Sequence, residues 1–111
     1  MIDTGTVDVV GVDPGRAEGV TGFKKVTRQV EEVNRQANAH AWSSSIVTAA
    51  SLAVSFSSKS CKLFEFKPLP NPMQNEFISE PIVHSEGWVY PMTNPGLGID
   101  VNEDFVKSIK Y

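Results

Sequence analysis

The chain has 111 residues, 41% of them hydrophobic and 21% charged, which is the composition of one ordinary globular domain and not of a disordered tail. Its formal net charge of −3 gives no reason to expect a nucleic-acid partner, because nucleic-acid binding needs clustered basic side chains. The single cysteine, Cys61, excludes a disulfide within the chain, so we expect a reducing, cytoplasmic setting.

The first predicted elements are a strand and a helix. Residues 7–13 (VDVVGVD) form a β-branched run that ends at the turn signal Pro14-Gly15, which indicates a strand. Apolar side chains then recur at helical spacing, at Phe23, Val26, Val30 and Val33. This pattern predicts an amphipathic helix, and Thr21 is its expected N-cap.

A second strand and helix follow. Residues 36–42 (QANAHAW) alternate between small apolar and polar side chains, which predicts a strand. The serines at 43–45 supply an N-cap for a helix that runs to about residue 57. The apolar run within this helix, residues 46–56, is too short to cross a hydrocarbon core of about 30 Å, so we expect no membrane partner.

Residues 62–67 (KLFEFK) form the third predicted strand, which stops before Pro68. Strand, helix, strand, helix and strand at these lengths are typical of parallel βαβ units in an α/β fold. The rest of the chain leaves this pattern. It predicts a hairpin around residues 85–87 and a short helix that begins at Asn102.

Each predicted strand carries one titratable residue near its C-terminal end. Period-two counting gives each strand one hydrophobic face and places a titratable residue on the other face, namely Asp13, His40 and Glu65. The C-terminal ends of strands are where α/β barrels place their chemistry. An acid, a histidine and an acid from three successive strands are therefore candidates for one catalytic row.

The same residues also have structural interpretations. Asp13 precedes Pro-Gly and could form a turn, and His40 could pack against Trp42 and the following helix. Glu65 lies between two phenylalanines, where a carboxylate is costly to bury unless it is paired or used. A phosphate-binding loop at residues 11–15 is a weaker alternative, because Asp13 would repel an anion.

Four stretches follow one another in order across almost the whole chain: GVDPGRAEGVTGFKKV, AHAWSSSIVTAASLA, LFEFKPLPNP and NPGLGIDVNEDFV. Together they resemble the C-terminal part of the mandelate racemase/muconate lactonizing group of the enolase superfamily. The resemblance implies that residues 1–79 are strands six to eight of a (β/α)7β TIM-type barrel, with three parallel strands and two helices. It implies that residues 80–111 are a tail, with the hairpin and the short helix, that returns to a capping domain.

The resemblance also implies roles for the three strand-end residues. His40 would be the general base that takes a proton from the carbon next to a carboxylate, and Asp13 would hydrogen-bond to it and orient it. Glu65 would hydrogen-bond a carboxylate oxygen of a sugar-acid substrate. The parent would be a Mg²⁺-dependent lyase (a dehydratase) or isomerase (a racemase). Its metal ligands would lie on strands three to five, which this chain lacks, so we expect the chain alone to bind no Mg²⁺ and to be inactive.

A second hypothesis comes from another class: a non-catalytic α/β module that self-associates. Three parallel strands with two helices leave both sheet edges open, and open edges favour pairing with a second copy. This predicts a homo-oligomer, at least a dimer. The two hypotheses differ on whether Asp13, His40 and Glu65 converge.

Overall fold

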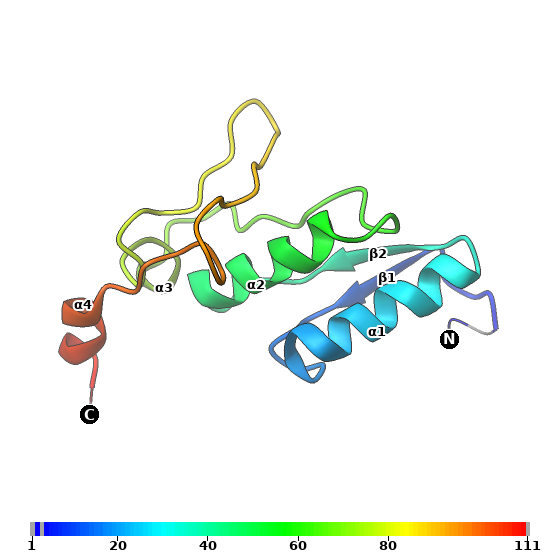
Figure 1. Ribbon diagram of the computed structural model, residues 1–111, viewed down its shortest axis with the longest axis horizontal. Coiled ribbons are helices and arrows are strands. Elements are labelled where there is room, and N and C mark those ends of the chain that lie inside the picture. Colours follow the sequence, from blue (N-terminus) through cyan, green and yellow to red (C-terminus); the bar gives the residue numbers. More distant parts are fainter. Residues whose placement is uncertain (1, 3, 111) are drawn as a thin grey trace.

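The computed structural model describes residues 2 and 4–110. Two parallel strands, β1 (Val9–Val12) and β2 (Gln36–Ala39), form a sheet, and the helix α1 (Gly19–Glu32) joins them. The helix α2 (Ser45–Phe56) follows β2, and two short helices, α3 (Pro72–Asn75) and α4 (Glu103–Ser108), lie in the later part of the chain. Figure 1 shows α1 and α2 side by side on one face of the sheet, with α4 at the far end of the molecule. The predicted α/β class is confirmed.

The register of the two strands decides which side chains are neighbours. Val9 is paired with Gln36 and Val12 with Ala39, in parallel. The backbone N–H of His40 donates to the carbonyl of Val12 at 2.8 Å, so the pairing continues one residue beyond the regular strands. Asp13 is therefore the first residue after β1 and His40 the first after β2, and the two lie at neighbouring strand ends.

The helix α1 begins two residues earlier than Thr21, so the predicted N-cap is wrong. The start is set by backbone conformation and not by a side-chain cap, since Glu18 has a φ of 57° and Gly19 a φ of 68°. Gly22 then comes so close to the preceding loop that a Cβ there would lie 1.7 Å from the carbonyl oxygen of Ala17. A larger residue does not fit at this point without moving the helix.

The core lies between the sheet and the two long helices. Small side chains on one face of β2 and just beyond it, Ala37, Ala39 and Ala41, are at most 2% exposed, as the alternation predicts. They leave room for larger side chains from the helices and from β1, namely Val12, Phe23, Val30 and Val54. Burial of this apolar surface is the main source of stability for the βαβα unit.

Side-chain caps fix two helix starts that the sequence predicts. Ser44 precedes α2, and its hydroxyl accepts the N–H of Val47 at 3.5 Å. Asn102 precedes α4, and its side-chain oxygen accepts the N–H of Phe105 at 3.1 Å. Both contacts satisfy donors that a helix start leaves without an intrahelical partner.

The segment 62–67 is not the regular third strand that the sequence predicts. It meets β2 through one parallel bridge, between His40 and Glu65, and the N–H of Ala37 donates to Ser60 at 3.2 Å. The chain advances three residues from Ala37 to His40 but five residues from Ser60 to Glu65. The two segments therefore do not keep a regular strand register. Leu63 in this segment is 77% exposed, and no further strand lies beside the segment in the part of the chain that the structure describes.

The predicted hairpin is reduced to its turn. Ser85 and Trp88 exchange both backbone hydrogen bonds, at 2.9 and 2.8 Å, around a two-residue turn with positive φ at Glu86 and Gly87. Another antiparallel bridge, between Ile78 and Val101, ties the tail together. Among the described residues, no helix combines the length and apolarity that a membrane span requires.

Candidate active site

The three predicted residues share one row at the C-terminal ends of the strands. Asp13 follows β1 where His40 follows β2, and His40 forms a parallel bridge with Glu65. Neighbouring positions on parallel strands project their side chains to the same face of a sheet. The backbone therefore brings an aspartate, a histidine and a glutamate to one edge, although the third strand is irregular.

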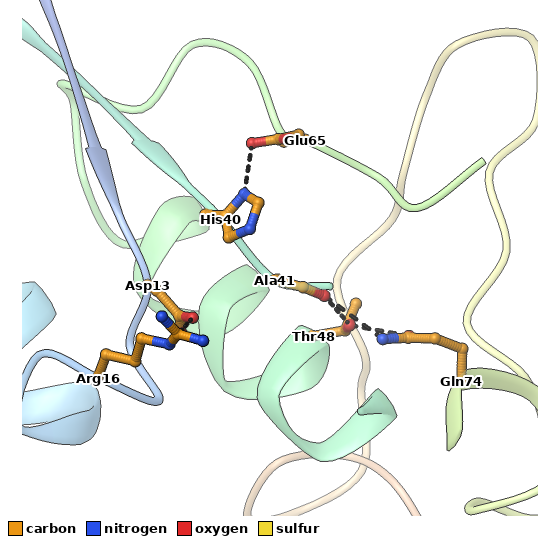
Figure 2. A network of polar contacts seen from close by, with 7 residues as sticks. All are labelled: Asp13, Arg16, His40, Ala41, Thr48, Glu65 and Gln74. Atoms are coloured by element: carbon orange, nitrogen blue, oxygen red, sulfur yellow. Dashed lines mark hydrogen bonds and ion pairs between the residues drawn. The ribbon is translucent and has the colours of Figure 1, made fainter. Parts of the chain in front are cut away.

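His40 and Glu65 are in direct contact. The imidazole Nδ1 lies 3.1 Å from Oε2 of Glu65, and the two side chains are 48% and 36% exposed (Figure 2). An ionised Glu65 can only accept, so this contact selects the tautomer of His40 with the proton on Nδ1. Neutral His40 then holds its lone pair on Nε2, the nitrogen on the opposite side of the ring.

Asp13 has other partners in this structure. Its Oδ1 accepts the backbone N–H of Gly15 at 2.8 Å, and its Oδ2 lies 3.5 Å from Nε of Arg16. Figure 2 shows Asp13 facing Arg16 while His40 faces Glu65. The carboxylate thus forms the turn after β1, which the sequence offered as its structural interpretation. The acceptor for Nδ1 of His40 is Glu65.

Trp42 packs against His40, as the structural interpretation of His40 predicted, although the sequence pattern assigned Trp42 no role in the site. Its ring is stacked on His40, with 5.4 Å between the ring centroids and an angle of 26° between the planes. Its carbonyl accepts a hydrogen bond from Nζ of Lys67 at 3.3 Å. The signal was available in the alternation, because Trp42 follows His40 by two residues and Lys67 follows Glu65 by two.

Two further residues hold the backbone immediately after His40. The carbonyl of Ala41 accepts the hydroxyl of Thr48, from α2, at 3.0 Å, and the side-chain amide of Gln74, from α3, at 3.4 Å (Figure 2). Thr48 is 3% exposed, so this contact is inside the protein. No local sequence pattern identifies it, because Gln74 reaches Ala41 from 33 residues away.

Residues 1–105 match the sequence model of the family described as enolase C-terminal domain-like. The chain belongs to this family. The resemblance to mandelate racemase/muconate lactonizing enzymes is thereby confirmed. A comparison with curated proteins gave no match for this enolase-like chain.

Solved structures give the same result. A candidate mandelate racemase from Bordetella bronchiseptica RB50, complexed with 2-oxoglutarate/phosphate, is 26% identical with a TM-score of 0.93, over 99% of this chain and 29% of its own. A candidate mandelate racemase/muconate lactonizing enzyme from Labrenzia alexandrii DFL-11 is 25% identical with a TM-score of 0.87, over 99% and 29%. An enolase from Pantoea ananatis with bound d-gluconate and Mg is 25% identical with a TM-score of 0.85, over 96% and 26%.

The enolase-like chain thus spans less than a third of the length of these structures, between 26% and 29%. The residues that the structure describes do not fit a magnesium ion. Among residues 2 and 4–110, no three side chains of the types His, Cys, Asp and Glu come together as a metal site would require. Mg²⁺ prefers near-octahedral oxygen ligation, whereas both oxygens of Asp13 and Oε2 of Glu65 already face Gly15, Arg16 and His40.

Proposed function

We propose that this chain supplies the proton-transfer side of an acid-sugar dehydratase or racemase, and that it needs further barrel strands to act. His40 is the general base, and Glu65 and Asp13 are the carboxylates that serve it and the substrate. The observation that carries the proposal is the contact of 3.1 Å between His40 and Glu65 at the C-terminal ends of parallel strands. This is the edge at which α/β barrels carry out catalysis.

The residue types suit removal of a proton next to a carboxylate. With Glu65 at Nδ1, the Nε2 lone pair of His40 takes the proton from the α-carbon, and the electron pair of the C–H bond moves into the substrate carboxylate. Glu65 stabilises the imidazolium that forms. Residues outside this chain would hold the Mg²⁺ that enolase-superfamily sites use, and that ion would supply electrostatic stabilisation of the ene-diolate.

Glu65 can contact the substrate as well as His40. Its Oε2 faces the imidazole, and a carboxylate has two oxygens with several acceptor positions. Two bare carboxylates repel each other, so we propose that Glu65 shares a proton with a carboxylate oxygen of the substrate. The two oxygens of Asp13 face Gly15 and Arg16 in this structure, and we assign its orienting role towards His40 to the assembled enzyme.

The substrate class that we propose is a sugar acid. The Pantoea ananatis enolase, 25% identical over 96% of this chain, holds d-gluconate and Mg. The test replaces the matching segment of that enolase with residues 1–105 and measures Mg²⁺-dependent conversion of d-gluconate and other sugar acids. We expect activity that His40→Asn abolishes, and no activity of the isolated chain. Conversion by the isolated chain, or by the grafted His40→Asn variant, contradicts the proposal.

A specific observation also favours self-association, the second candidate function. Beside the edge of β1 that has no strand partner among the described residues lies a groove whose apolar lining includes Val10, Val12, Val26 and Val33. Val9 on the same strand is 52% exposed. An open edge of this kind can pair with a second copy of the chain. Sedimentation velocity of the purified chain should then show at least a dimer, and a stable monomer at all concentrations contradicts it.

A further inference from the structure

Trp42 occupies a defined place around the proposed base. Its indole lies against the imidazole of His40 at 5.4 Å and 26°, while Glu65 meets Nδ1 of that imidazole at its edge. The ring of His40 is thus contacted on one face and at one edge. These two contacts leave Nε2 directed away from Glu65.

The backbone on either side of this indole is also fixed. The carbonyl of Ala41 accepts hydrogen bonds from Thr48 and Gln74, at 3.0 and 3.4 Å. The carbonyl of Trp42 itself accepts from Lys67 at 3.3 Å. Partners from α2, α3 and the segment 62–67 therefore anchor the two residues after His40. Trp42 is nevertheless 42% exposed, so core packing alone does not account for its position.

We infer that Trp42 is a positioning residue for His40, which holds the imidazole in the orientation that keeps Nδ1 on Glu65 and presents Nε2. This inference rests on the proposed function for its catalytic consequence. An indole face attracts a cation, so the stack also favours the imidazolium that follows proton transfer. Glu65 is the charged group in contact with the ring, while Lys67 donates to the carbonyl of Trp42 and Asp13 faces Gly15 and Arg16 beside it.

The first test uses the full chain, with no substrate. The protein has two tryptophans, so Trp88→Phe leaves Trp42 as the only indole fluorophore. A protonated imidazole in contact with an indole quenches its fluorescence, so the emission should rise from acid to alkaline solution while His40 is present. The rise should vanish when His40→Asn is added. An emission that does not depend on His40 overturns the inference.

The second test reports on orientation. Nitrogen-15 spectra of the imidazole distinguish a proton on Nδ1 from one on Nε2. We expect Trp42→Ala to move His40 from the Nδ1–H form towards a mixture, and Trp42→Phe to restore it, because phenylalanine keeps an aromatic face. Unchanged His40 signals in Trp42→Ala overturn the inference. Since the fluorescence test retains Trp42, it stays decisive even if Trp42→Ala fails to fold.

A third arm separates this inference from the proposed function. In the grafted barrel, Trp42→Ala should slow α-proton removal about tenfold or more, because small errors in the placement of a base are costly, and Trp42→Phe should recover most of the rate. Full activity of Trp42→Ala overturns the positioning role. Inactivity of the graft with all native residues contradicts the proposed function, while the fluorescence and nitrogen-15 results still decide whether Trp42 orients His40.

Discussion

The imidazole Nδ1 of His40 lies 3.1 Å from the carboxylate of Glu65, at the one bridge that joins the segment 62–67 to β2. The two residues are 25 positions apart in the sequence. Their contact therefore depends on the complete β2–α2 unit, and it links the architecture of the chain directly to the chemistry that we propose for it.

Replacement of Glu65 tests what this contact does to His40. Glu65→Leu removes the acceptor at Nδ1, so the Nδ1–H form loses its advantage and neutral His40 should shift towards the Nε2–H form. Nitrogen-15 spectra measure this directly. His84, which contacts Phe66 edge-on at 5.4 Å, is an internal reference whose signals should stay in place. Equal changes at both histidines would point to a general structural effect instead.

Glu31 predicts a dependence of stability on pH. The hydroxyl of Ser58 and the backbone N–H groups of Ser60 and Lys59 donate to its carboxylate and hold the pKa of Glu31 below its usual value. This stabilisation is present above the unfolded pKa of about 4.3 and is lost as the pH falls through the lower folded pKa.

Glu31→Gln should therefore lower the urea midpoint at neutral pH, and its difference from the unmodified chain should shrink in acid. The matched control is Glu32→Gln, the exposed neighbour on the same helix, which should change the midpoint little. A Glu31→Gln effect that is as large in acid as at neutral pH would show that the charge of Glu31 does not contribute through these hydrogen bonds.

Gly22 and Gly11 form a matched pair for packing. A Cβ at Gly22 would lie 1.7 Å from the carbonyl oxygen of Ala17, whereas a Cβ at Gly11 would meet nothing within 4 Å. Gly22→Ala should cost about 1–3 kcal/mol, because the overlap outweighs the helix preference for alanine. Gly11→Ala should be neutral or stabilising by up to about 1 kcal/mol. Urea unfolding of both variants decides, and equal effects would contradict the close approach at Gly22.

Thr48→Val tests the anchor behind His40. Thr48 is buried and donates to the carbonyl of Ala41 at 3.0 Å, so valine leaves that carbonyl with Gln74 as its remaining side-chain donor. We expect a loss of about 1–3 kcal/mol. Thr21→Val, on the exposed side of α1, should change stability by less than about 0.5 kcal/mol. Similar losses of stability in Thr48→Val and Thr21→Val would contradict a specific contribution of the Thr48 hydrogen bond.

Local patterns predicted the βαβα unit well. The alanines of residues 37–41 are buried, and the helix starts after Ser44 and Asn102 lie where the caps predict. The alternation also indicated that Asp13, His40 and Glu65 lie at one edge of the sheet. In parallel strands, residues at neighbouring positions point to the same face, so the alternation of one strand matches that of the next. The helix caps and the alternation of side chains can both be read from short stretches of sequence.

What the sequence did not predict depends on long-range contacts or on backbone conformation. The start of α1 follows from positive φ values at Glu18 and Gly19, which no capping residue signals. The segment 62–67 looks like a strand by composition, yet its offset against β2 and its open outer edge reduce it to one bridge. Which carboxylate contacts His40 likewise depends on side-chain rotamers, which no local pattern specifies. In the structure Glu65 contacts Nδ1 of His40, and Asp13 contacts Gly15 and Arg16.

The most direct test of the central claim measures exchange of the substrate α-proton. Residues 1–105 are grafted into the Pantoea ananatis enolase, and proton NMR follows a sugar acid with Mg²⁺ in deuterated water. With His40 present we expect the α-proton to be lost or replaced by deuterium, and with His40→Asn we expect that change to stop while the protein remains folded. An α-proton that is removed equally fast in the His40→Asn graft would contradict the assignment of His40 as the base.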